Sequence, residues 1–365
     1  MKRFLSALLS AVLLLSLSAC AGTDNPAPAP QPTQPTASAA PADTQSFTDS
    51  LGRTVDLPAQ IARVAVSGPM AQIALFALCP DKLVGVSSAW SKDAEQYLLP
   101  NYYNLPEVGQ LYGGKGEVNL ETLLELDPQV IIDIGEPKGS MAEDLDSLQE
   151  QIGIPFIHVT ATLENTGEAY RTLGKLLGLD AQGNRLGNYC DQVYREMAAL
   201  SDREEKVPLL YVTGPDGQNV IAQNSYHGEI IDLMSNNLAV VDAPSSLGTG
   251  NEVGMEQLLL WDPEVILFEP NGVYATVAGD PTWEELTAIS SGRYYEVPFG
   301  PYNWLGFPPA AQRYLGMLWL GKLLYPDEAQ YDLYEAVAEY YDLFYHCDLT
   351  WEQFDALVAN STGKQ

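Results

Sequence analysis

The chain has 365 residues, a length that fits two domains, and 46% of them are hydrophobic, which excludes wholesale disorder. It carries 48 Asp and Glu against 18 Lys and Arg, a formal net charge of −30. Such a surface repels phosphate, which argues against nucleic-acid binding and against attraction to anionic lipid.

The N-terminus has the composition of an export signal. Met1-Lys2-Arg3 precedes an apolar run through Leu17 that is too short to span a membrane, which takes about 20 residues. The run ends in Leu17-Ser18-Ala19-Cys20, which resembles the bacterial lipoprotein box, whose cysteine carries lipid. We expect a signal peptide over residues 1–19 and a lipid on Cys20. The alternative is an ordinary signal peptide with an incidental cysteine.

Residues 20–46 are rich in Pro, Ala and Thr and show no apolar periodicity. Such a segment cannot bury a core and is typical of a semi-extended tether. A tether behind a lipidated Cys20 suits a domain that works beside the bacterial cell membrane without entering it. The expected location is therefore extracytoplasmic, at the cell surface or in the periplasm.

From Asp49 onward, short apolar strands alternate with amphipathic helices. Strands are predicted at residues 63–66, 83–86, 129–134 and 154–159, and helices after Gly68-Pro69 and at 119–126 and 140–151. Residues 163–201 carry no strand signal and predict two helices with a break near Gly178 to Gly183. The alternation predicts a parallel sheet flanked by helices.

The alternation then restarts. Strands are predicted at residues 208–213, 220–223, 238–241, 264–268 and 293–297, and helices at 225–236, 255–260, 310–324, 329–347 and 350–360. We therefore predict an α/β fold of two Rossmann-like lobes with parallel sheets flanked by helices. The N-terminal lobe covers residues 47–162, a long helical connector 163–203, and the C-terminal lobe 204–365.

Two segments repeat the same pattern in the two lobes. Glu121 and Glu256 are each followed six residues later by Asp-Pro and then by a buried strand. Residues 121 and 256 are 135 positions apart, as are Asp127 and Asp262. Two lobes built on one plan create a cleft between them, and clefts between domains are favoured ligand sites.

Catalytic signatures are missing from the sequence. It has no Gly-x-Ser-x-Gly elbow, no His-Glu-x-x-His pair, no phosphate loop and no dinucleotide fingerprint. We therefore expect no enzyme activity, no cofactor and no direct metal site. A remote alternative is a lipid-anchored surface hydrolase using Ser225 and His227. The three cysteines after Cys20 are Cys79, Cys190 and Cys347, and the first two lie in apolar helical contexts typical of buried free thiols.

The whole pattern resembles the substrate-binding lipoproteins of ABC importers, in the group that serves iron-siderophore, haem and vitamin B12 uptake. The resemblance rests on residues 48–58 and 63–66, on residues 78–86, and on the paired Glu and Asp-Pro repeats. It implies two lobes joined by a long helix, with little hinge opening. It also implies a monomer whose partners are a membrane permease dimer and its cytoplasmic ATPase. Glu121 and Glu256 match the residues that dock such proteins onto the permease.

Aromatic and polar residues in loops beyond the predicted strands are the candidate ligand contacts, because ligands bind outside the carboxyl ends of strands in such folds. The predicted cleft residues are Met70, Trp90, Tyr112, Lys138, Tyr226, His227, Tyr302, Asn303 and Trp304. A ferric siderophore is the first choice of ligand, and a corrinoid such as vitamin B12 is close behind. Haem is the third, with Tyr112 or His227 as axial ligand. An oxyanion such as molybdate or tungstate is a further alternative, which would use Arg313 and the helix start at Gly68-Pro69.

Overall fold

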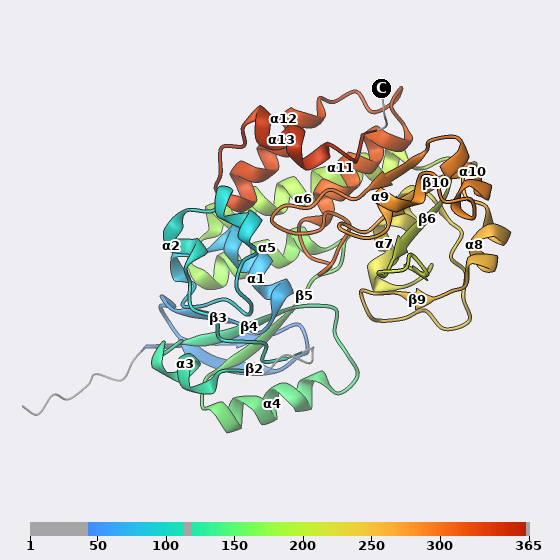
Figure 1. Cartoon of the computed structure of the whole chain (residues 1–365). Coiled ribbons are helices and arrows are strands. Elements are labelled where there is room, and N and C mark those ends of the chain that lie inside the picture. Colours follow the sequence, from blue (N-terminus) through green and yellow to red (C-terminus); the bar gives the residue numbers. More distant parts are fainter. Residues whose placement is uncertain (1–42, 113–117, 363–365) are drawn as a thin grey trace, which may run out of the picture. The chain divides into compact units, whose positions relative to one another are not determined.

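The structure is a computed structural model that describes residues 43–112 and 118–362 (Figure 1). The predicted signal peptide, Cys20 and the tether up to residue 42 lie outside the described residues. The predicted tether ends too late, because Thr44 to Ser46 already belong to a strand. This strand is β1 (Thr44–Thr48), which pairs antiparallel with β2 (Thr54–Pro58).

The N-terminal half contains a parallel sheet of three strands in the order β3 (Val64–Val66), β4 (Val130–Gly135) and β5 (Phe156–Thr160). Every residue of β3 and β4 is buried, as expected for apolar strands covered on both faces. The strand predicted at residues 83–86 is wrong, since Leu83 and Val86 make only isolated bridges. The helices and 3-10 turns of this half are α1 (Pro69–Leu78), η1 (Pro80–Lys82), η2 (Lys92–Gln96), α2 (Pro100–Tyr103), α3 (Leu120–Glu125) and α4 (Met141–Ile152).

Two helices, α5 (Thr166–Leu177) and α6 (Asp180–Leu200), connect the two sheets and confirm the predicted helix, break and helix. Gly178 ends α5 in the left-handed conformation at φ 69°, which glycine adopts without strain. The two helices pack closely at Gly174 and Gly183: an added Cβ on Gly183 would lie 2.6 Å from the Tyr170 carbonyl oxygen and 2.9 Å from the Gly174 Cα.

The C-terminal half contains a sheet of six strands, which are β6 (Pro208–Thr213), β7 (Asn219–Val220), β8 (Asn236–Asn237), β9 (Asn251–Glu252), β10 (Val265–Phe268) and β11 (Tyr294–Glu296). The path β11-β10-β6 is parallel, and β8 also pairs parallel with β6. The α/β class is confirmed, but β7 and β9 are antiparallel additions that the prediction of parallel sheets missed. For β7 the reason is a short turn after β6, with Gly214 and Gly217 at positive φ, because only antiparallel neighbours can be joined so briefly.

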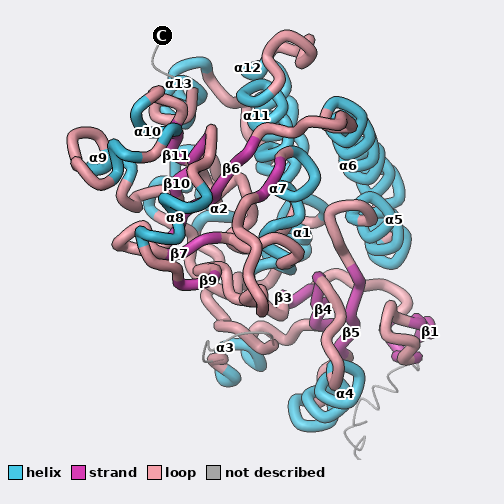
Figure 2. The backbone as a smooth tube through the Cα atoms, turned by 90° about the vertical axis from the view of Figure 1, so that its right-hand side faces the viewer, coloured by secondary structure: helices cyan, strands magenta, loops and turns pink. Residues whose placement is uncertain are grey.

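The helices of this half are η3 (Tyr226–Gly228), α7 (Glu229–Met234), α8 (Met255–Trp261), α9 (Tyr274–Val277), η4 (Trp283–Glu285), α10 (Thr287–Ser290), α11 (Arg313–Leu324), α12 (Leu333–Tyr340), the π-helical turn η5 (Tyr341–Tyr345) and α13 (Trp351–Val358). Figure 2 shows the two sheets as separate groups of strands, with α5 and α6 beside α11 and α1. Among residues 43–112 and 118–362, no helix has the length and apolar character to cross a membrane.

The last helices pack back onto the N-terminal half. His346 Nε2 lies 3.2 Å from the Phe76 carbonyl oxygen on α1, and Gln353 Nε2 donates to the Gln96 carbonyl at 3.2 Å. The Tyr341 hydroxyl donates to the Gly300 carbonyl. One hydrophobic core therefore runs through α1, the α5–α6 hairpin and the C-terminal helices. This shared core opposes large relative movements of the two sheets.

The glycine contact between α5 and α6 gives a stability prediction. Gly183→Ala gains about 1 kcal/mol of helix propensity. The Cβ would press on backbone atoms that cannot retreat, and overpacking of this kind costs about 1–3 kcal/mol. We expect a lower free energy of unfolding, measured by urea titration. Gly139→Ala is the control, because nothing lies within 4 Å of the Cβ it would add. A Gly183→Ala variant as stable as the parent would contradict the close-packing argument.

Candidate functional site

A cleft of about 350 Å³ lies between the carboxyl ends of the β3–β5 sheet and loops of the C-terminal half. Its first wall consists of residues 67–71, Gln110, Tyr112, residues 133–136, Lys138 and Met141. Its second wall consists of residues 226–227, 246–248 and 307–309. Five of the predicted contact residues lie on these walls, namely Met70, Tyr112, Lys138, Tyr226 and His227.

Two predicted cleft residues are instead core aromatics. Trp90 is buried, its Nε1 donates to the Tyr102 carbonyl at 3.1 Å, and its ring packs edge-on against Phe76 at 5.1 Å. Trp304 is fully buried. The prediction that these tryptophans line the cleft is wrong, because their rings complete the shared hydrophobic core.

Tyr302 and Asn303 also point inward. The Tyr302 hydroxyl accepts a hydrogen bond from Gln72 Nε2 at 2.9 Å, and Asn303 Nδ2 donates to the Tyr211 hydroxyl at 2.9 Å. Burial raises the pKa of Tyr302 far above its ordinary value. The glycines and prolines of the 299–309 segment are typical of an exposed binding loop, but Tyr302 and Asn303 find internal partners and turn that part of the segment into the protein.

Phe307 is the main contact residue left out of the predicted cleft residues, although it belongs to the aromatic segment at residues 299–309. It is 56% exposed and lines the cleft, with its ring centroid 6.3 Å from that of His227. The glycines and prolines around it in this segment are the sequence signal of an exposed position. Asp133 was also missed, although it is the one acidic residue inside the apolar strand β4.

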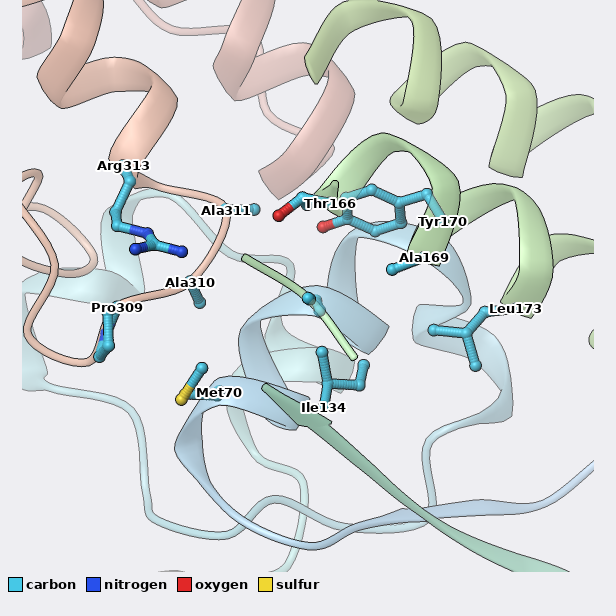
Figure 3. Close-up of a pocket in the computed structure, with 12 residues that line it drawn as sticks. Met70, Ile134, Thr166, Ala169, Tyr170, Leu173, Pro309, Ala310, Ala311 and Arg313 are labelled. Atoms are coloured by element: carbon cyan, nitrogen blue, oxygen red, sulfur yellow. The ribbon is translucent and has the colours of Figure 1, made fainter. Parts of the chain in front are cut away.

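Arg313 lies behind the second wall instead of in the cleft. It is 2% exposed, forms an ion pair with Glu229, and its guanidinium carbon lies 5.0 Å from the Tyr226 ring centroid. Figure 3 shows its side chain above Pro309 and Ala310, with Met70 on the opposite side of a small cavity of about 20 Å³. Arg313 Nε has no hydrogen-bond partner among the described residues. The small cavity shares Met70, Ile134 and Pro309 with the cleft.

The two polar aromatic residues of the second wall are held firmly. The Tyr226 hydroxyl donates to the Ala161 carbonyl at 2.9 Å, which links the two halves, and burial raises the pKa of Tyr226 to about 12. Burial lowers the pKa of His227, although the Gly306 carbonyl partly opposes this effect. That carbonyl lies 3.1 Å from His227 Nδ1, and because it can only accept, Nδ1 carries the proton. In the neutral ring, Nε2 is then an acceptor.

Three residues with formal charge line the cleft, namely Asp133, Glu136 and Lys138. The N-terminus of α1 adds partial positive charge, since its first turn holds no acidic residue and the Gly68 N-cap supplies no side-chain hydrogen bond. Pro69 and Met70, the first residues of α1, lie on the cleft wall. This helix start, together with Lys138, makes one end of the cleft suited to an anion.

The structure also locates the serine, histidine and cysteine side chains that were singled out from the sequence. The Ser225 hydroxyl donates to the Ala222 carbonyl at 2.7 Å and forms no hydrogen bond with His227, so this pair is no hydrolytic dyad. Cys79, Cys190 and Cys347 are free thiols, and the first two are buried as predicted. Within the described part of the chain, no group of three or more His, Cys, Asp or Glu residues gathers to hold a metal ion.

The two repeated glutamates occupy equivalent positions. Glu121 and Glu256 are exposed in the first turns of α3 and α8. Each of these helices is followed by an aspartate at positive φ, which is 47° for Asp127 and 38° for Asp262. The sequence repeat is therefore a repeat of local structure. Docking through these glutamates stays a prediction.

Known proteins with the same arrangement place the chain in a family. Residues 65–300 match the periplasmic binding protein family. The molybdate-binding protein MolA of Haemophilus influenzae is 26% identical over 333 residues, covering 82% of this chain and 90% of that protein.

Solved structures of solute-binding proteins have a similar fold. An ABC transporter solute-binding protein from Sulfurospirillum deleyianum superposes with a TM-score of 0.78 at 28% identity, covering 86% of this chain and 99% of that one. A periplasmic solute-binding protein from Veillonella parvula superposes with a TM-score of 0.71 at 25% identity, covering 87% of this chain and 98% of that one. The family match over residues 65–300 and the superposed folds lead to one conclusion: the chain belongs to the periplasmic binding protein family, the solute-binding components of ABC transporters.

Proposed function

We propose that this solute-binding protein captures a small oxyanion of the molybdate class in the cleft and delivers it to a membrane permease. The observation that carries the proposal is the uncapped start of α1, which opens into the cleft without a competing acid in its first turn. Orphan backbone N–H groups there donate to an anion, and the helix dipole adds to the attraction. The cleft volume of about 350 Å³ is near the lower end of the range for ligand pockets, about 300–1,000 Å³.

Two further points support an oxyanion. Lys138 is exposed on the same wall, and among the described residues it takes part in no ion pair. The relative from Haemophilus influenzae is named for molybdate binding and matches most of its own length. Arg313, the other residue that an oxyanion would use, is near but paired with Glu229. We assign it to holding Tyr226 in place instead of touching the ligand.

A ferric siderophore is the second candidate. It is favoured by the apolar part of the cleft, where exposed Phe307 and Leu247 lie beside Pro308. Such a surface would pack against the organic part of a chelate. The described cleft offers less to a corrinoid or to haem. The Tyr112 hydroxyl donates to Asp144, and His227 Nε2, an acceptor in the neutral ring, is the one feature described here that suits an axial ligand of haem.

The proposed function also includes attachment to the cell membrane and docking onto a permease. Lipid on Cys20 would hold the protein to the cell membrane, and residues 21–43 would serve as its tether. Glu121 and Glu256 would dock the two halves onto a permease dimer driven by a cytoplasmic ATPase. No catalytic step is proposed for this chain.

Lys138→Gln tests the oxyanion site. The substitution removes one charge-assisted hydrogen bond, so we expect molybdate affinity to fall about tenfold or more. Calorimetry is the suitable measurement, because no tryptophan is among the described residues that line the cleft. Lys92→Gln is the control, since Lys92 is exposed on η2 and does not line the cleft. Equal affinities in the two variants would exclude Lys138 from the site.

Phe307→Ala separates the two ligand classes. A siderophore packed on this ring would lose about tenfold in affinity, whereas molybdate held at the α1 N-terminus would lose none. The parent and the variant are titrated with both ligands. Leu260→Ala is the control, because Leu260 is more exposed than Phe307 and does not line the cleft. A selective loss of siderophore binding would favour the second candidate.

Reversing both repeated glutamates tests docking. Glu121→Lys with Glu256→Lys places like charges opposite a basic permease surface, so transport should fall by about tenfold or more while ligand affinity stays unchanged. Glu143→Lys is the control for a single reversal, since Glu143 is an exposed acid in the first turn of α4. The assay is ligand uptake by cells together with calorimetry on the purified protein. Undiminished transport would refute the docking role.

A further inference from the structure

A chain of buried polar groups runs inward from the first wall of the cleft. The Ser67 hydroxyl donates to Asp133 Oδ1 at 2.5 Å, and His158 Nδ1 lies 2.7 Å from Asp133 Oδ2. Asp133 and His158 are register partners on β4 and β5, and Ser67 directly follows β3. Two of the side chains therefore come from adjacent strands of one sheet, and the third comes from the end of the strand beside them.

Asp133 links this buried chain to the ligand. It is 8% exposed and lines the cleft together with Ser67, whereas His158 is fully buried behind it. Each carboxylate oxygen accepts one hydrogen bond from the protein, so the carboxylate is firmly oriented. A carboxylate in this position opposes the binding of a dianion unless its charge is balanced.

A proton on His158 would balance the charge of the Asp133 carboxylate, and the position of His158 allows this without rearrangement. His158 Nε2 lies 3.3 Å from the Thr160 hydroxyl oxygen. A hydroxyl can donate to Nε2 when the ring is neutral and accept from it when the ring is charged. The network is therefore satisfied in both protonation states, and an imidazole is the side chain that ordinarily changes charge between about pH 5 and 8.

We propose that Asp133 and His158 form a charge-adjusting pair that decides which ligand charge the cleft accepts: binding of a dianion draws one proton from solvent onto His158 Nε2. The proton converts the pair from a net charge of about −1 to about zero. The inference rests on the proposed oxyanion ligand and deepens it, because it makes affinity for that anion depend on a proton that the ligand does not touch.

Several charged groups surround the pair and set its response. Behind β5, Asp49 Oδ2 accepts from the His158 backbone N–H at 3.3 Å, and Asp49 is paired with Arg53 at 3.0 Å. Arg53 also pairs with Asp146 of α4 at 2.8 Å. On the cleft side are Tyr112, which Asp144 holds at 3.3 Å, together with Glu136 and Lys138. Asp49, Arg53 and Asp146 are paired with one another, whereas the Asp133 carboxylate has the His158 imidazole as its partner.

The test is calorimetry of molybdate binding to the whole protein, between about pH 6.5 and 8, in two buffers with different heats of ionisation. The parent should take up as much as about one proton per anion, and its affinity should rise by up to about tenfold per unit fall in pH. His158→Gln should abolish the uptake and hold affinity at the parent's high-pH value. Asp133→Asn should bind at least about tenfold more tightly than the parent at high pH, with no pH dependence.

Matched variants identify which imidazole takes the proton. His346→Asn should behave like the parent, because His346 does not line the cleft. His227→Gln should retain the proton uptake whatever its affinity. Uptake that survives in His158→Gln, or disappears in His227→Gln, would overturn the inference. If the variants of the pair fail to fold, Thr160→Val provides the second route, since it removes the acceptor of the charged ring and should reduce uptake.

The two levels of the proposal fail in different ways. Molybdate binding without proton uptake by the parent would overturn the charge-adjusting pair and leave the oxyanion assignment standing. No binding of molybdate or tungstate by the parent would overturn both.

Discussion

The burial of α1 is the constraint on which the rest of the structure depends. Every residue from Ala71 to Leu78 is buried, and the helix packs against β3, β4, the α5–α6 hairpin and η5. A helix covered on all sides by separate segments cannot shift without opening the core. Its first turn is the part that is not covered, and it faces the cleft. The helix is thus fixed at its C-terminal end and offers its N-terminal end to a ligand.

Gln72 shows how the fixed helix organises the segments around it. Its side chain is fully buried, and Oε1 accepts from the Ser87 backbone N–H and hydroxyl, both at 2.8 Å. Its Nε2 donates to the Tyr302 hydroxyl at 2.9 Å, which belongs to the C-terminal half. A buried amide with these partners is costly to break, since each group left unpaired loses about 1–3 kcal/mol. The 299–309 segment is therefore drawn inward at Tyr302, and only its end, residues 307–309, returns to the cleft.

The hydrogen bond between Gln72 and Tyr302 shows which parts of the structure could be predicted from the sequence and which could not. Apolar runs such as residues 129–134 and the helical signal of residues 163–201 depend on local periodicity, and both elements formed as predicted. The Tyr302 hydrogen bond joins residues 230 positions apart, and no local pattern carries that information. Trp90 and Trp304 were misplaced for this reason, because loop composition does not reveal whether an aromatic ring faces the core or the cleft. Lys138 and His227 were placed on the cleft correctly, since Lys138 follows a predicted strand and His227 lies at the start of a predicted helix. Tyr112 was also placed on the cleft, from the loop that precedes the predicted helix at residues 119–126.

Because the chain carries a large net negative charge, an anionic ligand must be attracted by groups close to the site. At a net charge of −30, the protein as a whole repels an anionic ligand, although salt screens exposed charges beyond about 8–10 Å. Attraction must then come from groups within that distance that cannot rotate away. A helix start is such a group, because the backbone holds its N–H donors in place and burial of the helix holds the backbone. Asp133 lies within the same wall and works against it, so a carboxylate that can be neutralised by its buried histidine makes an anion site compatible with an acidic protein.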